Sequence, residues 1–402
     1  MALFSSNDPA PSAANFRVVG SLADIARADW DAVANPEGEP YNPFLSHDFL
    51  WSLEESGAAT RRTGWAAQHL VQDGADGRPA AILPCYLKSH SMGEYVFDHG
   101  WAEAFDRAGG RYYPKLQASI PFTPATGRRL LVKTRDNREA AQRLLAGAAG
   151  ALTEKLGISS LHVTFAPEAE WSLLGSIGFL QRTDHQYHFV NEGYRDFEDF
   201  LSALASRHRK SVKRERRDAL ADGITVELLT GADISEAAWD AFFAFYIDTG
   251  SRKWGRPYLN RRFFSLVGER MADKILLIIA KRHGRPIAGA LNFIGSDTLY
   301  GRYWGAIEHQ PFLHFELCYY QAIEWGIVHG KHIVEAGAQG EHKVARGYRP
   351  TTTYSAHWIS DPRLRKAIAD YLKAERRQVE TENATLAEYL PFRHGDGGGE
   401  GT

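Results

Sequence analysis

The chain has 402 residues, so a prior of roughly 150 residues per domain predicts two domains, or at most three. Its 44% hydrophobic and 24% charged residues are typical of a globular protein, and a net charge of −2 argues against a generally basic surface for binding DNA. Cys85 and Cys318 are too few for a disulfide framework or a cysteine-based zinc site, which favours a reducing, cytoplasmic compartment.

The two ends of the chain are predicted to be disordered. Residues 1–15 are rich in Ser, Pro and Ala, and they lack the basic start and long apolar core of a signal peptide. The final residues "RHGDGGGEGT" are equally polar. The apolar run at 275–280 is far too short to cross a bilayer, so no membrane span is expected.

Alternating apolar residues predict strands in both halves of the chain. The first half has strand-like runs at 65–73, 79–88 and 94–101, and the second half at 275–284, 286–296 and 298–305, with turn-forming "HGRP" and "GSDT" between the latter. A helix at 139–157, with Leu144, Ala148, Leu152 and Leu156 on one apolar stripe, precedes a strand at 161–165, a short helix and a closing strand at 185–190.

The second half repeats this ending. A helix at 316–330 leads to a strand at 332–337, the stretch "AGAQGEHKVARGY" and a closing strand at 351–359. His162 and His332 occupy like places on the first strand of each repeat, and Gly178 and Gly347 each lie ten residues before a histidine-aromatic pair. We therefore predict an α/β (α+β) fold of mixed sheets flanked by helices, divided into a disordered N-terminus (1–15), domain 1 (16–190), domain 2 (191–375) and a C-terminal helix and tail (376–402).

This order of elements resembles the GNAT acyltransferase fold occurring twice. The stretches "NPFLSHDFLWSLEESG", "SHSMGEYVFDHGWAEAF", "YYPKLQASIPFTPATGRRLL" and "EAGAQGEHKVARGYRPTTTYSAHWI" resemble a FemAB-like bacterial family labelled as peptidoglycan biosynthesis or recognition proteins, and the likeness covers most of residues 42–375. The resemblance implies transfer of an acyl or aminoacyl group to an amine acceptor, with a small molecule or a peptidoglycan precursor as substrate. A rival reading is a binding module that recognises such a precursor or another anionic ligand without catalysis.

The resemblance leaves the acyl donor open. GNAT domains that bind acetyl-CoA carry a glycine-rich turn whose backbone N–H groups hold the pyrophosphate. After "LYGRYWG" this chain reads "AIEHQPFLHFELC", which has no glycine. Fem-type proteins also lack that turn and take the acyl group from aminoacyl-tRNA, so acyl-CoA and aminoacyl-tRNA are both candidate co-substrates, and no permanently bound cofactor is expected.

Glycines and charged residues after the strand at 332–337 form the main candidate site. Open sheets bind ligands at such strand ends, and glycine allows the backbone to approach them closely. The candidate catalytic residues are Glu335 or Glu341 as general base, His342 as proton shuttle, and Lys343 as a cation for a phosphate or carboxylate. Gln339, Arg346 and Tyr348 are candidate substrate-binding residues. The alternative is a tight structural turn with a solvated charge cluster.

Further substrate-binding candidates lie in four other stretches. They are Asp98 and His99 in "YVFDHGWAEAF", Lys115 in "GGRYYPKLQASIPFTP", Arg252 and Trp254 in "DTGSRKWGRPYLNRRFF", and Tyr303 in "TLYGRYWG". Asp98 and His99 are placed at a strand end, and Lys115 suits an anion beside aromatic rings. The alternatives are an inter-domain plug that buries Tyr112 and Tyr113, and a core position for Trp254.

A basic helix is predicted over "FLSALASRHRKSVKRERRDALADG". Arg207, Lys210, Arg214 and Arg217 recur at helical spacing on one face, where they can bind the phosphates of tRNA or of a diphosphate-linked precursor. The alternative is a solvated face with Leu201, Leu204 and Val212 turned inward. We find no metal-ligand spacing and no nucleophile motif, so neither a metal site nor a covalent acyl-enzyme is expected.

Overall fold

The computed structural model describes residues 16–133, 136–253, 257–337 and 340–393. Contacts between residues divide the chain into two compact units. Unit 1 comprises Met1–Asp184, Tyr258–Met271 and Thr352–Glu380, and unit 2 comprises His185–Pro257, Ala272–Thr351 and Thr381–Thr402. These stretches interleave along the chain, whereas the predicted domains are consecutive segments; the boundaries at 190/191 and 375/376 stay a prediction.

Unit 1 contains an antiparallel sheet in the order β1-β3-β4-β7 and a second run of strands in the order β15-β8-β6-β5-β2. In the second run β6 and β8 are parallel, and the other neighbours are antiparallel. The strands are β1 (Phe16–Val19), β2 (Trp65–Ala67), β3 (His69–Asp73), β4 (Pro79–Leu83), β5 (Tyr86–Lys88), β6 (Lys115–Ala118), β7 (Leu131–Val132), β8 (Ser160–Ala166) and β15 (Arg349–Ile359). The helices are η1 (Leu22–Asp24), α1 (Arg27–Ala34), η2 (Pro43–Leu45), α2 (His47–Glu55), η3 (Arg61–Thr63), α3 (His99–Arg107), α4 (Arg138–Lys155), α5 (Glu168–Ser176) and α9 (Arg261–Met271).

Two predictions for this half need correction. The run at 94–101 is not a strand, because Glu94 and Asp98 turn their carboxylates onto Lys115 and the segment then enters α3. The apolar stripe of α4 is only partly confirmed. Ala148 and Leu152 are half-buried and pack against the core, but Leu156 lies just after the helix and is 45% exposed. The fully buried face carries Gln142, Leu145, Ala146, Gly147, Ala149, Gly150 and Thr153. Small residues on this face let α4 approach the sheet closely.

Unit 2 is built on strands in the order β10-β11-β12-β13-β14-β9, in which β13 and β14 are parallel and the other neighbours antiparallel. The strands are β9 (Leu180–Val190), β10 (Ile224–Leu229), β11 (Ile275–Arg282), β12 (Arg285–Ile294), β13 (Thr298–Ala306) and β14 (Ile333–Glu335). The helices are α6 (Phe197–Ala203), α7 (Ser206–Ala219), η4 (Gly231–Asp233), α8 (Glu236–Lys253), η5 (Ala272–Lys274), α10 (Leu313–Phe315), the π-helical segment η6 (Glu316–Tyr320), α11 (Gln321–Val328) and η7 (Glu341–Arg346).

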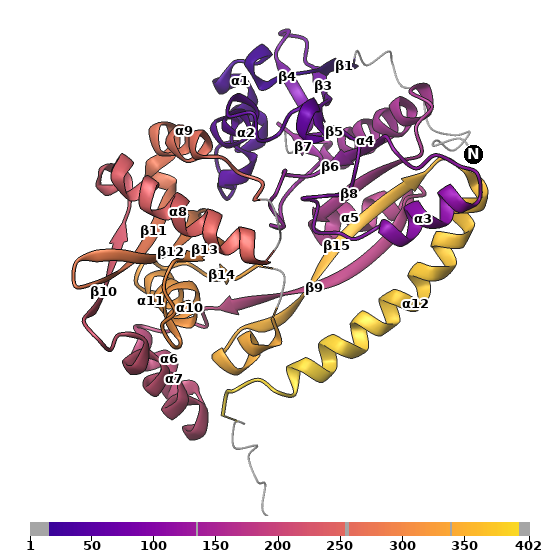
Figure 1. Ribbon diagram of the computed structural model, residues 1–402. Coiled ribbons are helices and arrows are strands. Elements are labelled where there is room, and N and C mark those ends of the chain that lie inside the picture. Colours follow the sequence, from indigo (N-terminus) through magenta and orange to yellow (C-terminus); the bar gives the residue numbers. More distant parts are fainter. Residues whose placement is uncertain (1–15, 134–135, 254–256, 338–339, 394–402) are drawn as a thin grey trace, which may run out of the picture. The chain divides into compact units, whose positions relative to one another are not determined.

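Helix α8 packs against β12 and β13, and α10, η6 and α11 form one continuous helix that also contacts this sheet (Figure 1). A Cβ added at Gly305 of β13 would lie 2.2 Å from the backbone of Phe245, so glycine is required where α8 meets the sheet. The core beneath the helices includes Ile278, Leu299 and Leu317, all fully buried. The predicted mixed sheets flanked by helices are thus confirmed.

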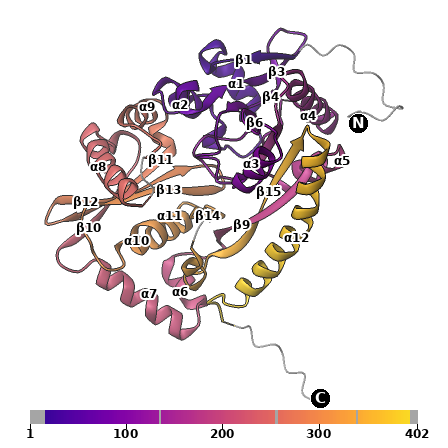
Figure 2. The same cartoon turned by 45° about the vertical axis from the view of Figure 1, so that its right-hand side comes forward.

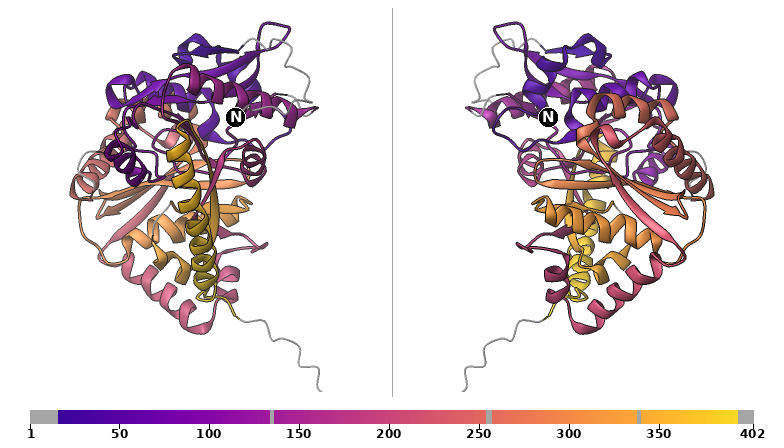
Figure 3. Two further views of the ribbon diagram at one scale, coloured as in Figure 1. Left: turned by 90° about the vertical axis from the view of Figure 1, so that its right-hand side faces the viewer. Right: turned by 90° about the vertical axis from the view of Figure 1, so that its left-hand side faces the viewer.

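The predicted internal repeat corresponds to the element orders α4-β8-α5-β9 and α11-β14-η7-β15. Figure 2 labels α4, α5 and β9 of the first and α11, β14 and β15 of the second. The closing strands β9 and β15 each run from one unit into the other. Helix α12 (Pro362–Ala387) follows as one long helix (Figure 3). Across the described residues, no helix combines the length and the apolar composition that a bilayer span requires.

The predicted basic helix is two helices. Asp196 caps α6 by accepting a hydrogen bond from the Asp199 N–H at 2.7 Å, and the helix ends where Leu204 becomes extended. The Ala205 N–H then donates to the Pro391 carbonyl at 2.8 Å, and Leu204 bridges to Phe392. The break between α6 and α7 therefore allows residues 204–205 to pair with residues 391–392 near the end of the described chain. Leu201, Leu204 and Val212 are buried as predicted.

Candidate active site

Strands β13 and β14 separate within unit 2. They are paired from Thr298 to Tyr300, opposite Ile333 to Glu335, but beyond this point β13 continues to Ala306 paired with β12 and no longer with β14. The backbone carbonyl of Glu335 lies 2.9 Å from the Cβ that a side chain at Gly301 would have, so glycine permits this close approach. Beyond the separation, β14 gives way to Gly337 with φ of 78°, and β13 gives way to the glycine-free turn. Both segments carry candidate residues.

A cavity of about 330 Å³ lies where α8 ends beside the turn that follows β13. Thr249 and Arg252 hold α8 to β13, because Thr249 accepts a hydrogen bond from the Ala306 N–H at 3.0 Å and Arg252 donates to the Ala306 carbonyl at 2.7 Å. The other lining residues are Trp304, Glu308, His309, Gln310, Phe312, Leu313, His314 and Phe315. The predicted residue Arg252 thus lines this cavity.

The wall formed by His314 and Phe315 connects the cavity with η7. The ring of Phe315 lies 5.4 Å from that of His342, and the ring of His314 lies 5.2 Å from Trp304. Tyr319 shares a 3.0 Å hydrogen bond with His342 Nε2. Burial, followed by the charges of Arg346 and Lys343, lowers the pKa of His342, which favours the neutral ring that can accept a proton.

Arg346 is bound within unit 2. It donates to both oxygens of Glu215 at 2.9 Å and lies 3.6 Å from the centre of the Phe315 ring. Tyr320 also donates to Glu215. Because its guanidinium is already paired with a buried carboxylate, Arg346 fixes η7 against α7 and supports the Phe315 wall.

Glu335, His188 and Lys343 gather around the end of β14. Glu335 pairs in register with His188 of β9, and the His188 Nε2 lies 3.8 Å from a Glu335 carboxylate oxygen. Lys343 is 2% exposed and donates to the Gly337 carbonyl at 3.1 Å. Burial lowers the pKa of Lys343 to about 8, and burial together with the Lys343 charge lowers the pKa of His188 to about 4. The Glu335 carboxylate can take a proton from an amine, whereas the lowered pKa of His188 keeps its ring neutral and makes it a weak base beside that carboxylate.

The remaining candidates of this half are spread out. Glu341 is exposed, and Tyr303 on β13 lies with its ring 5.5 Å from Tyr246 of α8. Tyr348 is fully buried in the core, where it contacts Tyr319 and Phe189. Gln339 and Trp254 lie outside the described residues.

Asp98 and Lys115 lie in unit 1 and bind each other. Their side chains are 2.5 Å apart and fully buried, with Glu94 at 2.7 Å from Lys115 and Tyr112 donating to Asp98 at 2.6 Å. Burial opposes both charges, yet the mutual attraction dominates, so the pKa of Lys115 is raised and that of Asp98 lowered. Asp98 precedes α3 instead of ending a strand, and His99 is exposed on the first turn of that helix.

The exposed face of α7 carries the predicted cations. Arg207, Lys210 and Arg214 are exposed, and no ion pair to them occurs among the described residues. Arg217 is also exposed but pairs with Asp218 at 2.8 Å, while Arg216 turns inward to Glu316 and Glu324. Three cations therefore stay available to an anionic ligand.

His188, Glu215, Phe315 and Tyr319 are site residues that sequence reasoning missed. His188 is the histidine of the pair that follows Gly178 by ten residues, and its contact with Glu335 depends on a pairing of distant strands. Glu215 lies among the basic residues of the predicted helix, yet it is buried and binds Arg346. Phe315 and Tyr319 lie one helical turn apart, and this spacing could have marked them as one face.

The fold and this arrangement define an α+β protein in which helices flank mixed sheets, and β13 and β14 separate at the candidate site. The family model for FemAB-like proteins, described as peptidoglycan biosynthesis/recognition, matches residues 21–394, and the chain belongs to this family.

Solved structures agree on the fold. The crystal structure of FemX aligns with a TM-score of 0.54 at 13% identity and covers 86% of this chain and 98% of its own. The C-terminal domain of a putative lysylphosphatidylglycerol synthetase from Agrobacterium fabrum aligns with a TM-score of 0.51 at 8% identity, covering 93% and 100%. No curated protein matches the sequence.

Proposed function

We propose that this protein is a cytoplasmic transferase that moves an acyl or aminoacyl group to an amine acceptor linked to peptidoglycan precursors. Membership of the FemAB-like family over residues 21–394 carries the proposal, because the family is described as one of peptidoglycan biosynthesis/recognition. The structures of FemX and of the C-terminal domain of a putative lysylphosphatidylglycerol synthetase share the fold.

The chemistry needs a nucleophilic amine, a group that takes its proton, and a cation near the acyl donor. Glu335 and His188 lie together at the end of β14, and Lys343 lies buried close behind the same strand end. We assign removal of the amine proton to Glu335 with His188. We assign positioning of the acyl donor to Lys343 and Arg252, and to His342 at the cavity wall.

Aminoacyl-tRNA is our preferred donor. The pyrophosphate of coenzyme A is bound by backbone N–H groups, which glycine residues leave accessible. The turn after β13 contains no glycine, and the side chains of Glu308 and His309 line the cavity there. The unpaired cations of α7 can instead neutralise phosphates of an RNA backbone. An acyl-CoA is the alternative donor.

A donor comparison tests the proposal. The purified protein is incubated with a UDP-linked muropeptide and either an aminoacyl-tRNA pool or an acyl-CoA, and the muropeptide mass is measured. We expect a mass increase of one aminoacyl residue with the tRNA pool, and its loss in Glu335→Gln. The matched control is Glu388→Gln, which removes an exposed carboxylate elsewhere in unit 2.

A different result would change the assignment. A mass increase with acyl-CoA alone would transfer the donor role to coenzyme A and contradict our reading of the turn. Binding of the muropeptide without a mass change under either condition would favour the recognition module, because the ligand would then be held without reaction.

A further inference from the structure

Two lysines lie directly opposite each other on neighbouring strands of unit 1. Lys88 of β5 pairs in register with Lys115 of β6, and both residues are fully buried. Like charges in such a pair repel each other, and burial removes the water that would screen them. The pair therefore needs carboxylates close by. They come from the segment 89–98, which contains no helix or strand.

Glu94 and Asp98 of this segment bind the two lysines unequally. The Nζ atom of Lys115 lies 2.7 Å from Oε2 of Glu94 and 2.5 Å from Oδ2 of Asp98. Lys88 is held less tightly, because its Nζ atom lies 3.8 Å from Oε1 of Glu94, beyond hydrogen-bond distance. This buried Oε1 atom has no hydrogen-bond partner among the described residues. The contact between Lys88 and Glu94 is thus the loose one.

The middle of the segment packs closely on its surroundings. Lys88 donates to the Met92 carbonyl at 3.2 Å and lies 3.6 Å from the centre of the Trp65 ring. Gly93 has φ of 80°, its carbonyl accepts from the Phe122 N–H at 3.1 Å, and a Cβ added to it would lie 2.6 Å from the Phe122 ring. Because side chains and single backbone bonds hold the segment, it can move without breaking a helix or a sheet ladder.

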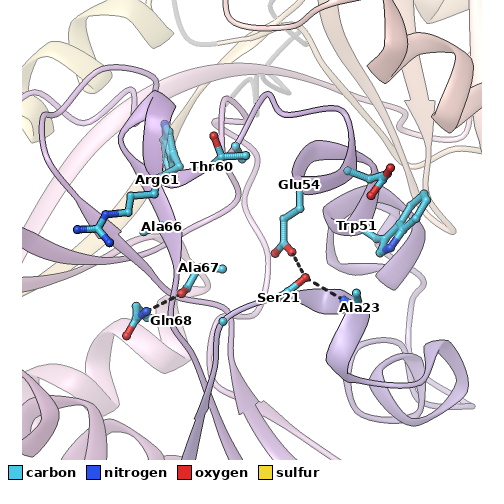
Figure 4. Close-up of a pocket in the computed structure, with 13 residues that line it drawn as sticks. Ser21, Ala23, Trp51, Glu54, Thr60, Arg61, Ala66, Ala67 and Gln68 are labelled. Atoms are coloured by element: carbon cyan, nitrogen blue, oxygen red, sulfur yellow. Dashed lines mark hydrogen bonds between the residues drawn. The ribbon is translucent and has the colours of Figure 1, made fainter.

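The beginning of the segment is anchored to η3. Nε2 of His90 lies 3.2 Å from the Thr63 carbonyl. Thr60 and Arg61, at the start of this short helix, line a cavity of about 410 Å³ (Figure 4). Neither partner of the loose contact lines the cavity. The loose contact therefore belongs to the segment itself and not to this cavity.

The segment lies over the counterpart, in unit 1, of the candidate active site. β6 and β8 form the parallel pair of unit 1, as β13 and β14 do in unit 2. Glu335 of β14 pairs with His188 of β9. The same places in unit 1 are taken by His162 of β8 and His357 of β15, which also pair. Asp98 lies with its Oδ2 atom 3.9 Å from Nε2 of His162, so the segment reaches both strands of the parallel pair.

We propose that residues 89–98 form a lid over the parallel pair β6–β8, that the contacts of Asp98 fix one end of the lid, and that Lys88 and Glu94 form a latch that responds to pH. The proposal concerns unit 1 alone and does not depend on the transfer chemistry assigned to unit 2. Failure of the transfer assay would leave the lid standing, and the reverse.

The latch takes up and releases protons close to neutral pH. Burial lowers the pKa of Lys88 from 10.5 to about 7, against the attraction of Glu94. Burial raises the pKa of Glu94 from 4.5 to about 7, against the attraction of Lys115. Opening the lid returns both groups to their ordinary pKa. Loss of the Lys88 proton above pH 7 therefore favours the closed lid, and so does protonation of Glu94 below pH 7. We expect the lid to open most easily close to pH 7.

Most other charged groups around the latch keep their charge over this range. The pKa of Lys115 is raised and that of Asp98 lowered, so both stay charged, and the pKa of His162 is lowered to about 3, so its ring stays neutral. His90 is the exception. Burial and the Lys88 charge lower its pKa, so its protonation in acid favours the open lid and opposes Glu94. The remaining neighbours are Tyr112, Tyr113 and Tyr258, whose pKa values are raised, and Arg182, which donates to the Phe97 carbonyl.

The test is amide hydrogen exchange of the full chain at pH 5.5, 7 and 8.5, measured by mass spectrometry and corrected for the intrinsic rate at each pH. Peptides from 89–98 are compared with peptides from β8, which report unfolding of the core. We expect the opening constant of 89–98 to fall roughly fivefold or more from pH 7 to pH 8.5, and less than about twofold in Lys88→Met. Glu103→Gln, which removes an exposed carboxylate of α3, is the control and should keep the profile of the parent.

Glu94→Gln tests the acid side of the profile. From pH 7 to pH 5.5 the opening constant of the parent should fall roughly fivefold or more relative to that of the variant. His90 is present in both proteins and cancels in this comparison. Parallel profiles of the parent, Lys88→Met and Glu94→Gln would overturn the latch. Exchange of 89–98 at the rate of β8 would overturn the lid, because the segment would then open only when the core unfolds.

Gly93→Ala tests the lid without changing a charge. The added methyl group would overlap the Phe122 ring, and alanine is strained at this positive φ. We expect the opening constant of 89–98 to rise roughly tenfold or more at all three pH values, while exchange of β8 stays unchanged. Unchanged exchange of 89–98 in this variant would overturn the packing of the lid on Phe122.

Discussion

Lys343 holds its ammonium group in a position that is almost closed to water. The pKa of about 8, compared with 10.5 for an exposed lysine, means that the folded protein binds this proton less readily than the unfolded chain does. Stability is therefore reduced below about pH 8 and recovers as the pH rises toward 10.5, by up to roughly 3 kcal/mol. A cost of this kind is typical of a residue retained for function.

Lys343→Met should accordingly stabilise the protein at pH 7 and abolish transfer. Urea unfolding of the variant at pH 7 and pH 9.5 should show a smaller rise in free energy with pH than the parent shows. Lys366→Met, which removes an exposed lysine of α12, is the control and should leave both properties unchanged. A destabilised Lys343→Met would mean that the hydrogen bond to Gly337 outweighs the burial of the charge.

His162 and His357 form a buried pair on adjacent strands of unit 1. Their Nδ1 atoms are 2.7 Å apart, so one ring donates to the other and at least one is neutral. Burial, and then the charge of Lys115, lowers the pKa of His162 to about 3. Between pH 6.5 and 3 the unfolded chain thus binds a proton that the folded one refuses, and stability falls as the pH falls.

His162→Asn should weaken this acid sensitivity. Between pH 7 and pH 4.5 the free energy of unfolding should drop by about 2 to 3 kcal/mol less in the variant than in the parent. Glu94, whose pKa burial raises to about 7, acts in the opposite direction, but it is present in both proteins and cancels in the comparison. Parallel pH profiles would show that the His162 ring takes up its proton in the folded state.

Among the elements, α7 is the one whose polar face was predicted well. Helical spacing alone placed Arg207, Lys210 and Arg214 together, because exposed charged residues follow the 3.6-residue period without help from tertiary contacts. The run at 94–101 was wrong for the opposite reason. Its alternating pattern suits a strand, but the ion pairs with Lys115 come from a distant strand and are not visible in local sequence.

Arg214→Glu should weaken aminoacyl-tRNA binding and lower the slope of log K against log salt by about 1 to 2, as expected when a phosphate contact is lost and a repulsion gained. Arg217→Glu is the matched control, since Arg217 already pairs with Asp218. Filter binding between 50 and 200 mM salt would measure both slopes. Identical slopes for the two variants would remove α7 from the proposed RNA contact.

The contact between α8 and β13 depends on Gly305. Any side chain there would overlap the backbone of Phe245 and Tyr246, so Gly305→Ala should destabilise the protein by about 1 to 3 kcal/mol. Gly100→Ala in α3 meets open space and should stabilise it by about 0.5 to 1 kcal/mol. Chemical denaturation of both variants would measure their free energies of unfolding. An unchanged free energy of unfolding in Gly305→Ala would imply that α8 can move to accommodate the added methyl group.

At the scale of the whole molecule, the internal repeat could be recognised from the sequence. The interleaving of the two units along the chain could not. Each helix–strand–helix–strand ending follows from apolar periodicity, and Gly347 with φ of 90° ends η7 where the sequence placed a turn. The assignment of 258–271 and 352–380 to unit 1 rests on contacts far apart in sequence. Periodicity carries no information about such contacts.

A fragment spanning 16–190 should therefore fail to fold alone. It lacks α9 and β15, and without β15 the strand β8 loses the partner of His162 and Leu161. Two-dimensional amide NMR of the fragment should show poor dispersion, and adding a peptide of residues 349–380 should improve it. A well-dispersed spectrum of the fragment alone would instead support the predicted boundary at residue 190.

The path of β15 also sets an order of events during synthesis. The ribosome synthesises strands β10 to β14 before β15. The edge of β8 that pairs with β15 therefore stays unpaired while most of unit 2 is synthesised. Unpaired strand edges are the sites at which nascent chains aggregate or recruit chaperones. Premature termination anywhere before residue 352 would leave this edge of β8 unpaired. We expect such a truncated chain to aggregate or to bind chaperones.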